Sequence, residues 1–261
     1  MKLKIHSWGG LGSQLHAISL IYDLKQNFPK REIILIHHTS GVSKRLFESE
    51  IFLDKSIELR IIDDYKWEKR SYAGKDMYLK KSFLHLAKYL LNFFSISIDV
   101  DKNKFRLIKP WTMELRGHYS NLEINKNFLK LCVELFTSNN LKNIDFQDAL
   151  VIHYRLGDLL TLAEKSIISP DRILKEVKKV SNLYEFDKVV IYSDSTSVAE
   201  QKLSELNNIF DQIVYSDDPT IKVMESAITG KFFIGTNSKV SFWIENFRHS
   251  IQKSSFIIHR N

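Results

Sequence analysis

The sequence predicts an α/β protein made of two Rossmann-like domains whose parallel sheets face a cleft. In both halves of the 261-residue chain, short apolar segments of strand length alternate with segments of helical periodicity, which is typical of doubly wound sheets. A polar stretch at residues 138–148 separates the two halves. We therefore expect an N-terminal domain at residues 1–140 and a C-terminal domain at residues 141–261.

The first half is expected to start with a short strand, a glycine-rich turn and a helix that ends before Pro29. A loop containing Pro110 leads to the segment MELRGHY before the last helix of this half. The expected strands are Leu3–Trp8, Glu32–His37 and Glu58–Ile62. The other expected helices are residues 76–95, Lys126–Thr137 and one that forms Gly41–Phe52 together with its following turn.

The expected helix at residues 76–95 is strongly amphipathic, with Phe83, Leu90 and Phe94 on its apolar face. It is either packed on the first sheet or placed at a lipid interface. It belongs to a basic segment, residues 66–109, with eleven Lys and Arg against four Asp and Glu. Such a segment suits an anionic membrane surface or a phosphorylated acceptor. Its aromatic residues lie at helix-core spacing, which argues against nucleic acid as a partner.

The second half is expected to begin with the apolar strand Ala149–Ile152. Ser169, Pro170 and Asp171 predict a helix start, because they supply a cap, a first-turn proline and an acidic residue. The other expected strands are Lys188–Tyr192, Gln212–Tyr215 and Phe232–Gly235, and the expected helices are residues 170–182, Ser197–Asn207, Thr220–Ile228 and one that begins with Ser241–Phe247.

A cluster of polar residues, His153, Arg155, Gly157 and Asp158, directly follows the strand Ala149–Ile152. In open α/β sheets, ligands bind outside the carboxyl ends of the strands. A guanidinium at such a place can hold two oxygens of a diphosphate at once. Alternatively, Arg155 and Asp158 form an ion pair that caps the strand end. This stretch alone favours neither interpretation.

The segment Gly9–Leu15 joins a strand end to a helix start through three glycines. Glycines let the backbone approach a ligand closely, and free N–H groups at a helix start attract anions. The spacing matches neither the Walker loop nor the dinucleotide-binding fingerprint. A tight connection without a ligand is the alternative.

The composition restricts the class of protein. The first residues, MKLKIHSW, contain no long apolar region and no cleavage site, so a secretory signal is not expected. No stretch approaches the length of an apolar transmembrane segment. The single cysteine, Cys132, allows neither a disulfide framework nor a zinc site within one chain. We expect a cytoplasmic protein.

Several separate motifs resemble those of the α-1,2-fucosyltransferases of glycosyltransferase family 11, and they occur in the family's order. Residues 9–15, GGLGSQL, resemble its G-G-L-G-N-Q-L loop, and residues 153–158, HYRLGD, resemble its H-x-R-R-G-D. Residues 192–195, YSDS, resemble F-S-D-D, and residues 237–243, NSKVSFW, resemble N-S-T-F-S-W-W. Residues 117–120, GHYS, are a weaker match to G-Y-W-Q-S.

The resemblance implies a GT-B-type fold and an inverting transfer from a nucleotide-sugar donor, GDP-fucose in the family, without a bound metal or a cofactor. It implies that Arg155 contacts the donor diphosphate and that His153 and Asp158 shape the site. The other residues expected to bind the donor are Gly10, Gly12, Ser13 and Gln14 in the first domain and Asp194, Asn237, Ser238 and Ser241 in the second. The residues themselves agree, because arginine and helix starts can stabilise a diphosphate leaving group without a metal. One D-x-D pattern, Asp99–Asp101, is present, but it lies in a polar segment far from the other motifs and is not expected to hold a metal.

Three positions depart from the family pattern: Ser13 replaces an asparagine, Leu156 an arginine and Ser195 an aspartate. The donor is therefore GDP-fucose or another diphosphate-activated sugar. The implied acceptor is a glycan, free or lipid-linked, in the synthesis of a surface polysaccharide such as O-antigen. The competing hypothesis is a catalytically silent nucleotide- or glycan-binding module of the same fold.

Inverting transfer also needs a base that removes the proton of the acceptor hydroxyl. Asp158 ranks first, because it stands in the central motif nearest the expected donor. Glu164 and His16 are the alternatives. Each of the three also has a purely structural interpretation, Asp158 as the partner of Arg155, Glu164 as a solvated loop residue and His16 as a buried helix residue.

Overall fold

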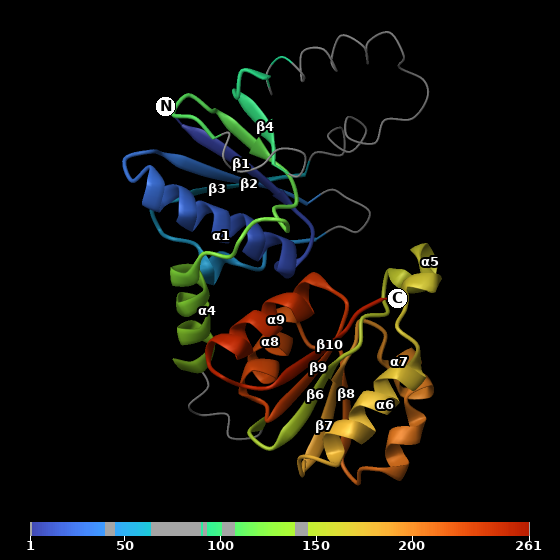
Figure 1. Cartoon of the computed structure of the whole chain (residues 1–261). Helices are drawn as coiled ribbons and strands as arrows, with labels where there is room; N and C mark the ends of the chain where they lie inside the picture. The colour runs from blue at the N-terminus through green and yellow to red at the C-terminus, as the bar shows by residue number, and fades with distance from the viewer. Residues whose placement is uncertain are drawn as a thin grey trace. The chain divides into compact units, whose positions relative to one another are not determined.

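The structure, a computed structural model, describes residues 2–39, 45–63, 90, 93–100, 108–138 and 146–260. The chain divides into two compact units, Met1–Phe128 and Leu129–Asn261 (Figure 1). Each unit contains a five-stranded sheet whose neighbouring strands are parallel. The predicted α/β class with two parallel sheets is confirmed. The division falls within helix α4 (Lys126–Ser138), earlier than the polar stretch in which the sequence placed it.

The first sheet has the strand order β3-β2-β1-β5-β4. Its centre is β1 (Leu3–Trp8), and α1 (Leu11–Asn27) packs on β1 with its apolar side chains fully buried. The chain moves outward from β1 to β2 and β3 and then returns to the other side of β1 through β4 and β5. The bounds of these strands are β2 Ile33–His38, β3 Glu58–Ile62, β4 Ser97–Asp99 and β5 Glu114–Arg116.

The helix expected at Gly41–Phe52 is wrong for the part that the structure describes. Residues 45–49 are not helical, and Glu50–Phe52 forms a single 3-10 turn, η1. The backbone groups of these residues are used elsewhere, because the Arg45 carbonyl accepts a hydrogen bond from His37 and the Leu46 carbonyl accepts one from Gln14. Most of the expected helix 76–95, and of the basic segment that contains it, lies outside the described residues.

The second sheet has the strand order β10-β9-β6-β7-β8. Its centre, β6 (Ala149–His153), is buried from Ala149 to Ile152, as expected for a strand covered on both faces. The chain moves outward through β7 and β8, then crosses over to β9 on the other side of β6. The bounds of the other strands are β7 Lys188–Tyr192, β8 Ile213–Ser216, β9 Phe232–Thr236 and β10 Ser255–Ile258.

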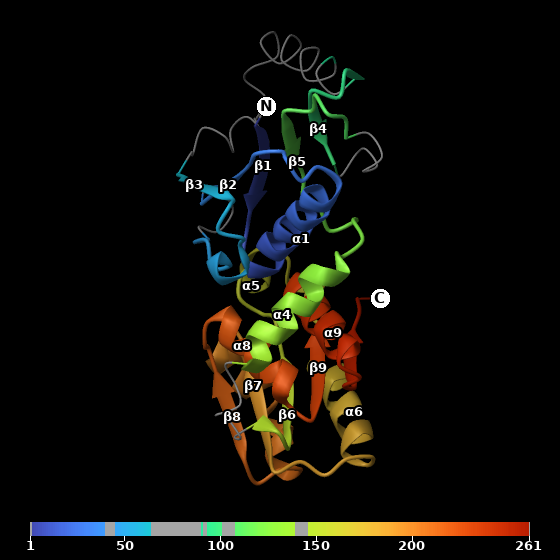
Figure 2. The ribbon, with the colours of Figure 1, turned by 90° about the vertical axis from the view of Figure 1, so that its left-hand side faces the viewer.

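Helices α6 and α7 cover one face of the second sheet, and α8 and α9 cover the other (Figure 1, Figure 2). The helix expected at Ser197–Asn207 is α7 followed by a separate 3-10 helix, η6. This tighter turn brings Leu203 and Leu206 to the same buried face. The bounds are α5 Leu159–Leu162, η5 Glu164–Ser166, α6 Pro170–Ser181, α7 Thr196–Lys202, η6 Ser204–Asn208, α8 Thr220–Thr229 and α9 Lys239–Ser250.

A fully buried arginine, Arg248 of α9, joins three segments of the second unit. Its guanidinium donates to the carbonyls of Ala227 and Gly230 at the end of α8, of Lys231 and of Ser254 before β10. No carboxylate pairs with it among the residues described, and burial lowers the pKa of Arg248 to about 10. The cation is therefore held by carbonyl dipoles at a helix C-terminus.

Candidate functional site

The candidate site lies at the carboxyl edge of the second sheet, where β6 and β9 are neighbours. The chain leaves β6 toward β7 on one side and reaches β9 on the other, so β6 and β9 flank the point where the strand order reverses. Loops that diverge at such a point form the crevice in which α/β sheets bind ligands. Most of the sequence-predicted residues of the second domain follow the strands at this edge. They are His153 at the end of β6, Arg155 and Asp158 after it, Asp194 after β7, and Asn237, Ser238 and Ser241 after β9.

Thr236, the last residue of β9, links β9 to the end of β6 through hydrogen bonds of its side chain. Its hydroxyl donates to the His153 carbonyl at 3.0 Å and accepts the Arg155 amide at 3.0 Å. The side chain is buried. Arg155 therefore leaves the sheet from a fixed backbone position. Thr236 was not among the residues expected from the sequence, although a hydroxyl residue directly before Asn237-Ser238 at a strand end is a recognisable signal.

The His153 imidazole is oriented by a pair of serines from the start of α9. Its Nδ1 lies 2.8 Å from the Ser241 hydroxyl, which is fully buried. Ser238 caps α9 by accepting the Ser241 amide at 3.0 Å, and the two serine hydroxyls are 3.1 Å apart. Burial, helped by the charge of Arg155 and opposed by that of Asp194, lowers the pKa of His153 to about 4. At neutral pH, His153 is therefore an uncharged imidazole in a fixed orientation.

Arg155 and Asp158 form the ion pair that the sequence offered as an alternative. One terminal nitrogen of Arg155, Nη2, is 3.1 Å from both oxygens of Asp158. The Arg155 side chain is 36% exposed, and its Nη1 and Nε have no partner among the described residues. The ion pair thus positions the guanidinium and leaves most of its donors available to a ligand.

Asp194 shapes the loop that follows β6. Its Oδ1 accepts the amides of Leu156 and Gly157 at 3.0 and 2.7 Å. A Cβ atom at Gly157 would lie only 1.9 Å from Oδ2 of Asp194, so the close approach requires glycine. The side chain of Asp194 is exposed. Its expected contact with the nucleotide stays a prediction. In the structure, Asp194 holds the backbone of the loop after β6.

Helix α9 starts at the same edge, directly after the exposed Asn237. Ser238 satisfies the Ser241 amide, and the remaining amides of the first turn lie at the positive end of the helix dipole. A guanidinium, a neutral imidazole and a helix N-terminus in one place are suited to the oxygens of an anion such as a diphosphate.

The glycine loop of the first unit has a well-defined local structure. Gly9 has a φ of +85°, which favours glycine, and Gly10 is the N-cap of α1, so Gly12 and Ser13 lie in its first turn. Gln14 is fully buried, and both the NH₂ group and the carbonyl group of its side-chain amide form hydrogen bonds. It donates to the carbonyls of Gly9 and Leu46 at 2.9 and 2.7 Å.

The Gln14 carbonyl accepts the Glu48 amide at 2.8 Å and the Ser49 hydroxyl at 2.9 Å. All four hydrogen bonds that a primary amide can make are therefore formed within the unit. Donor binding by Gly10, Gly12, Ser13 and Gln14 stays a prediction. What the structure shows for Gln14 is that it ties residues 46–49 to the glycine turn.

The three candidate bases differ in their surroundings. Asp158 is partly buried and engaged with Arg155. Glu164 is exposed in η5, and His16 is buried in α1. Asp158 therefore contacts another candidate residue, Arg155, directly.

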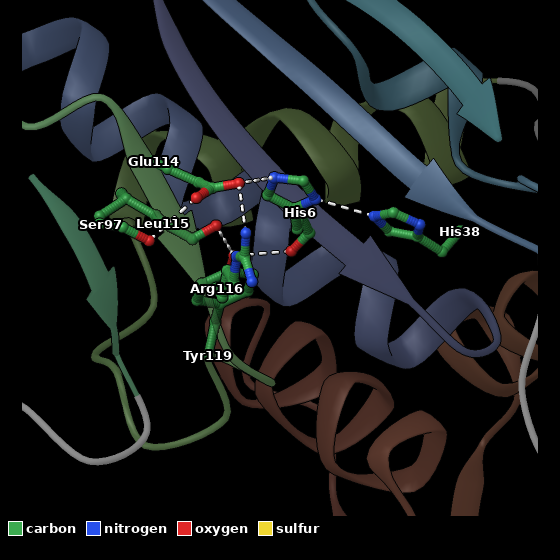
Figure 3. Close-up of polar contacts among 7 residues, drawn as sticks. All are labelled: His6, His38, Ser97, Glu114, Leu115, Arg116 and Tyr119. Atoms are coloured by element: carbon green, nitrogen blue, oxygen red, sulfur yellow. Dashed lines mark hydrogen bonds and ion pairs between the residues drawn. The ribbon is translucent and has the colours of Figure 1, made fainter. Parts of the chain in front are cut away.

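A polar network in the first unit was not expected from the sequence (Figure 3). Glu114 of β5 lies at its centre, with Oε1 2.7 Å from His6 Nε2 and 2.8 Å from Arg116 Nη2. On the other side of the ring, His6 Nδ1 lies 2.8 Å from His38 Nε2. Burial raises the pKa of Glu114, but the bonds from His6 and Arg116 outweigh burial and hold it well below its usual range.

The network joins four neighbouring strands, because β2 supplies His38, β1 supplies His6, β5 supplies Glu114 and Arg116, and β4 supplies Ser97. Ser97 of β4 donates to the other oxygen of Glu114 at 2.9 Å. The only signal in the sequence is polar residues inside apolar strand segments, and it does not show which of them meet. We infer that the network fixes the register of the first sheet.

No protein-family model and no curated protein matches the sequence. Solved structures resemble its fold. POFUT1 in complex with GDP-fucose has a TM-score of 0.51 and 9% identity, covering 99% of this chain and 98% of that chain. The fucosyltransferase NodZ from Bradyrhizobium has a TM-score of 0.52 and 10% identity, covering 94% and 92%. The E. coli heptosyltransferase WaaC with ADP has a TM-score of 0.53 and 10% identity, covering 100% and 94%. The chain has the fold of these transferases. The predicted GT-B-type fold is confirmed.

Two further observations bear on partners. Among the described residues, no group of three or more His, Cys, Asp and Glu side chains is placed to hold a metal ion. None of the helices described combines the length and apolar character that crossing a bilayer requires.

Proposed function

We propose that the chain is an inverting glycosyltransferase that takes its sugar from a nucleoside-diphosphate donor bound at the carboxyl edge of the second sheet. The observation that carries this proposal is the convergence of Arg155, His153 and the start of α9 at the point where the strand order reverses. Polar groups gathered at such a crevice are suited to a phosphorylated ligand.

The chemistry of the leaving group explains the residue types. When the bond between the sugar and the diphosphate breaks, negative charge grows on the diphosphate and has to be stabilised. Arg155 can donate from Nη1 and Nε, which no described residue engages, while Asp158 holds Nη2. His153 is neutral at pH 7. It can therefore donate a hydrogen bond from one ring nitrogen without adding a second positive charge beside Arg155. No metal or cofactor is part of this proposal.

The similar transferases guide the choice of donor. POFUT1 was solved with GDP-fucose, NodZ is a fucosyltransferase, and WaaC was solved with an ADP-linked 2-deoxy-2-fluoro heptose. Both sugars are attached to a nucleoside diphosphate. Together with the family 11 motifs, they make GDP-fucose the first donor to test and an ADP-activated sugar the second.

The proposed acceptor is a glycan, free or lipid-linked, in the synthesis of a surface polysaccharide such as O-antigen. The proposed place of action is the cytoplasm, with peripheral contact to the inner face of the membrane through the basic segment 66–109. Nucleic acid is not a proposed partner. A catalytically silent nucleotide- or glycan-binding module is the second hypothesis, and the partly exposed, preorganised Arg155 favours the enzyme.

Thermal stabilisation by a panel of donors tests the proposal. GDP-fucose, an ADP-activated sugar and a UDP-activated sugar are each added to the full chain, with GDP, ADP and UDP as controls, because a ligand that binds only the folded state raises the unfolding temperature. We expect one nucleotide class to stabilise the chain, and its sugar to be released or transferred in the presence of EDTA. Stabilisation without turnover favours the silent module. Turnover that EDTA abolishes and Mn²⁺ restores contradicts the metal-free mechanism.

A further inference from the structure

Four large apolar side chains lie exposed on the first unit, in the segments that precede β4 and β5. We name Phe93, Phe94, Trp111 and Met113 the apolar patch. Their exposed fractions are 69%, 58%, 54% and 48%. Large exposed apolar groups that gather in one place mark binding surfaces, whereas single ones scattered over a surface need no explanation.

The patch is held together by contacts between its two segments. The Trp111 indole donates to the Phe94 carbonyl at 3.0 Å, and the Met113 amide donates to the Ile96 carbonyl at 2.8 Å. The rings of Phe93 and Phe94 meet edge to face, with centroids 5.3 Å apart. The two segments that carry these side chains are therefore joined at the amino edge of the first sheet.

Three basic residues lie in or beside residues 109–113, the segment that carries Trp111 and Met113. Lys109 is exposed two residues before Trp111, and Arg31 donates to the carbonyls of Lys109 and Thr112. Lys4 is exposed, and its amide donates to the Met113 carbonyl at 2.9 Å. The nearest acid in sequence, Glu114, is already engaged by His6 and Arg116. Phe93, Phe94 and Lys109 also belong to the basic segment 66–109, which has an excess of Lys and Arg.

We propose that this amino edge of the first sheet is a membrane-docking surface whose occupant is an anionic lipid bilayer. Tryptophan and phenylalanine settle at the boundary between headgroups and acyl chains, and nearby lysine and arginine are attracted by anionic headgroups. A small apolar patch alone binds a membrane weakly, and so do a few basic residues alone. Together they are sufficient for reversible attachment of the protein to the membrane. This inference rests on the peripheral membrane contact of the proposed function and names the side chains that make it, and its test does not use the donor site of the second unit.

Vesicle sedimentation tests the proposal with the full chain and no donor. The probes are vesicles of phosphatidylcholine alone and vesicles that also contain phosphatidylglycerol, at about 0.1 M salt so that surface charges are not screened completely. The test variant is Phe94→Ser with Met113→Ser. The matched control is Leu183→Ser with Val214→Ser, two exposed apolar residues of the second unit with exposed fractions of 70% and 48%.

We expect the wild-type protein to bind the anionic vesicles and to bind neutral vesicles with an affinity at least about tenfold lower. The affinity of the test variant for anionic vesicles is expected to be at least about tenfold lower than that of wild type. The control variant is expected to bind like wild type. Lys109→Glu provides a second variant that does not touch the apolar side chains, and it is expected to weaken binding to anionic vesicles only. Unfolding temperatures confirm that each variant is folded.

Equal binding of wild type and both apolar variants, or no binding of wild type to anionic vesicles, overturns the proposal. The second result would leave a protein partner as the occupant of the patch. Donor-induced stabilisation is measured separately without vesicles, so failure of the docking surface and failure of the proposed function give different results.

Discussion

Replacing Gly157 by alanine tests how closely the loop after β6 is fitted to Asp194. The new Cβ would lie 1.9 Å from Oδ2 and 2.4 Å from Cγ of Asp194, so the carboxylate has to move. Moving it breaks the hydrogen bonds from the Leu156 and Gly157 amides. Each bond to a charged acceptor contributes about 1.5 kcal/mol or more, and exposure of the carboxylate reduces this, so we expect Gly157→Ala to cost roughly 2–4 kcal/mol.

The assay is thermal unfolding followed by circular dichroism, in which such a loss lowers the unfolding temperature by roughly 6–12 °C. Gly10→Ala is the matched control, because a Cβ there meets nothing within 4 Å. If the clash is the cause, Gly157→Ala combined with Asp194→Ala is no less stable than Asp194→Ala alone. An unchanged unfolding temperature of Gly157→Ala, or full additivity of the two substitutions, would refute the reasoning.

Three other predictions concern residues in different parts of the chain. Arg248→Met leaves several buried carbonyls without a donor and is expected to cost about 3–5 kcal/mol in chemical denaturation, which a loss below about 1 kcal/mol would contradict. Because the pKa of Glu114 is depressed in the folded state, its stabilising effect is present above about pH 4.5 and is lost as the pH falls below this value. In the Glu114→Gln variant, the free energy of unfolding should therefore fall less steeply with decreasing pH below about 4.5 than in wild type. The same pH dependence in both proteins would show that Glu114 contributes nothing. Asp158→Asn should reduce turnover at least about tenfold if Asp158 is the base, while donor-induced stabilisation persists. Retained turnover would make Asp158 a positioning residue for Arg155.

The strands of both sheets could be predicted because their signal is local. Ala149–Ile152 and Ile33–Leu35 are short, continuous apolar runs, and burial on both faces selects such runs whatever surrounds them. The start of α6 at Pro170 was also predictable, because proline and its neighbours act on the adjacent backbone. The short strands β4, β5 and β10 were missed. Strands of three residues, such as β4 and β5, carry too little periodicity to be recognised.

The contacts of the site could be predicted only in part. The motif after β6 placed His153, Arg155 and Asp158 at a strand end, and the structure does bring Asp194 and Ser241 to them. The sequence could not show that Asp194 requires Gly157 or that Thr236 bridges β6 and β9, because these pairs are about 40 and 80 residues apart. The Glu114 network was missed for the same reason.

The failed helix at Gly41–Phe52 shows a different limit. Its apolar spacing allowed a helix, but Gln14, more than 30 residues earlier in the sequence, and His37 of β2 offer hydrogen-bond partners to the backbone of residues 45–48. These tertiary contacts replace the hydrogen bonds of a helix. Propensity and periodicity describe only local preferences, which such contacts can override.

The central claim is that Arg155 stabilises the diphosphate of the donor. Measuring both the donor affinity and the turnover of the Arg155→Ala variant tests this claim most directly. We expect transfer to fall at least about a hundredfold while the unfolding temperature without donor stays close to that of wild type. Arg155→Lys should also transfer poorly, because a single ammonium cannot replace the guanidinium fork. Lys231→Ala, which removes a cation at the opposite edge of the same sheet, is the control and should transfer normally. A folded Arg155→Ala protein that binds donor and transfers sugar like wild type would contradict the account.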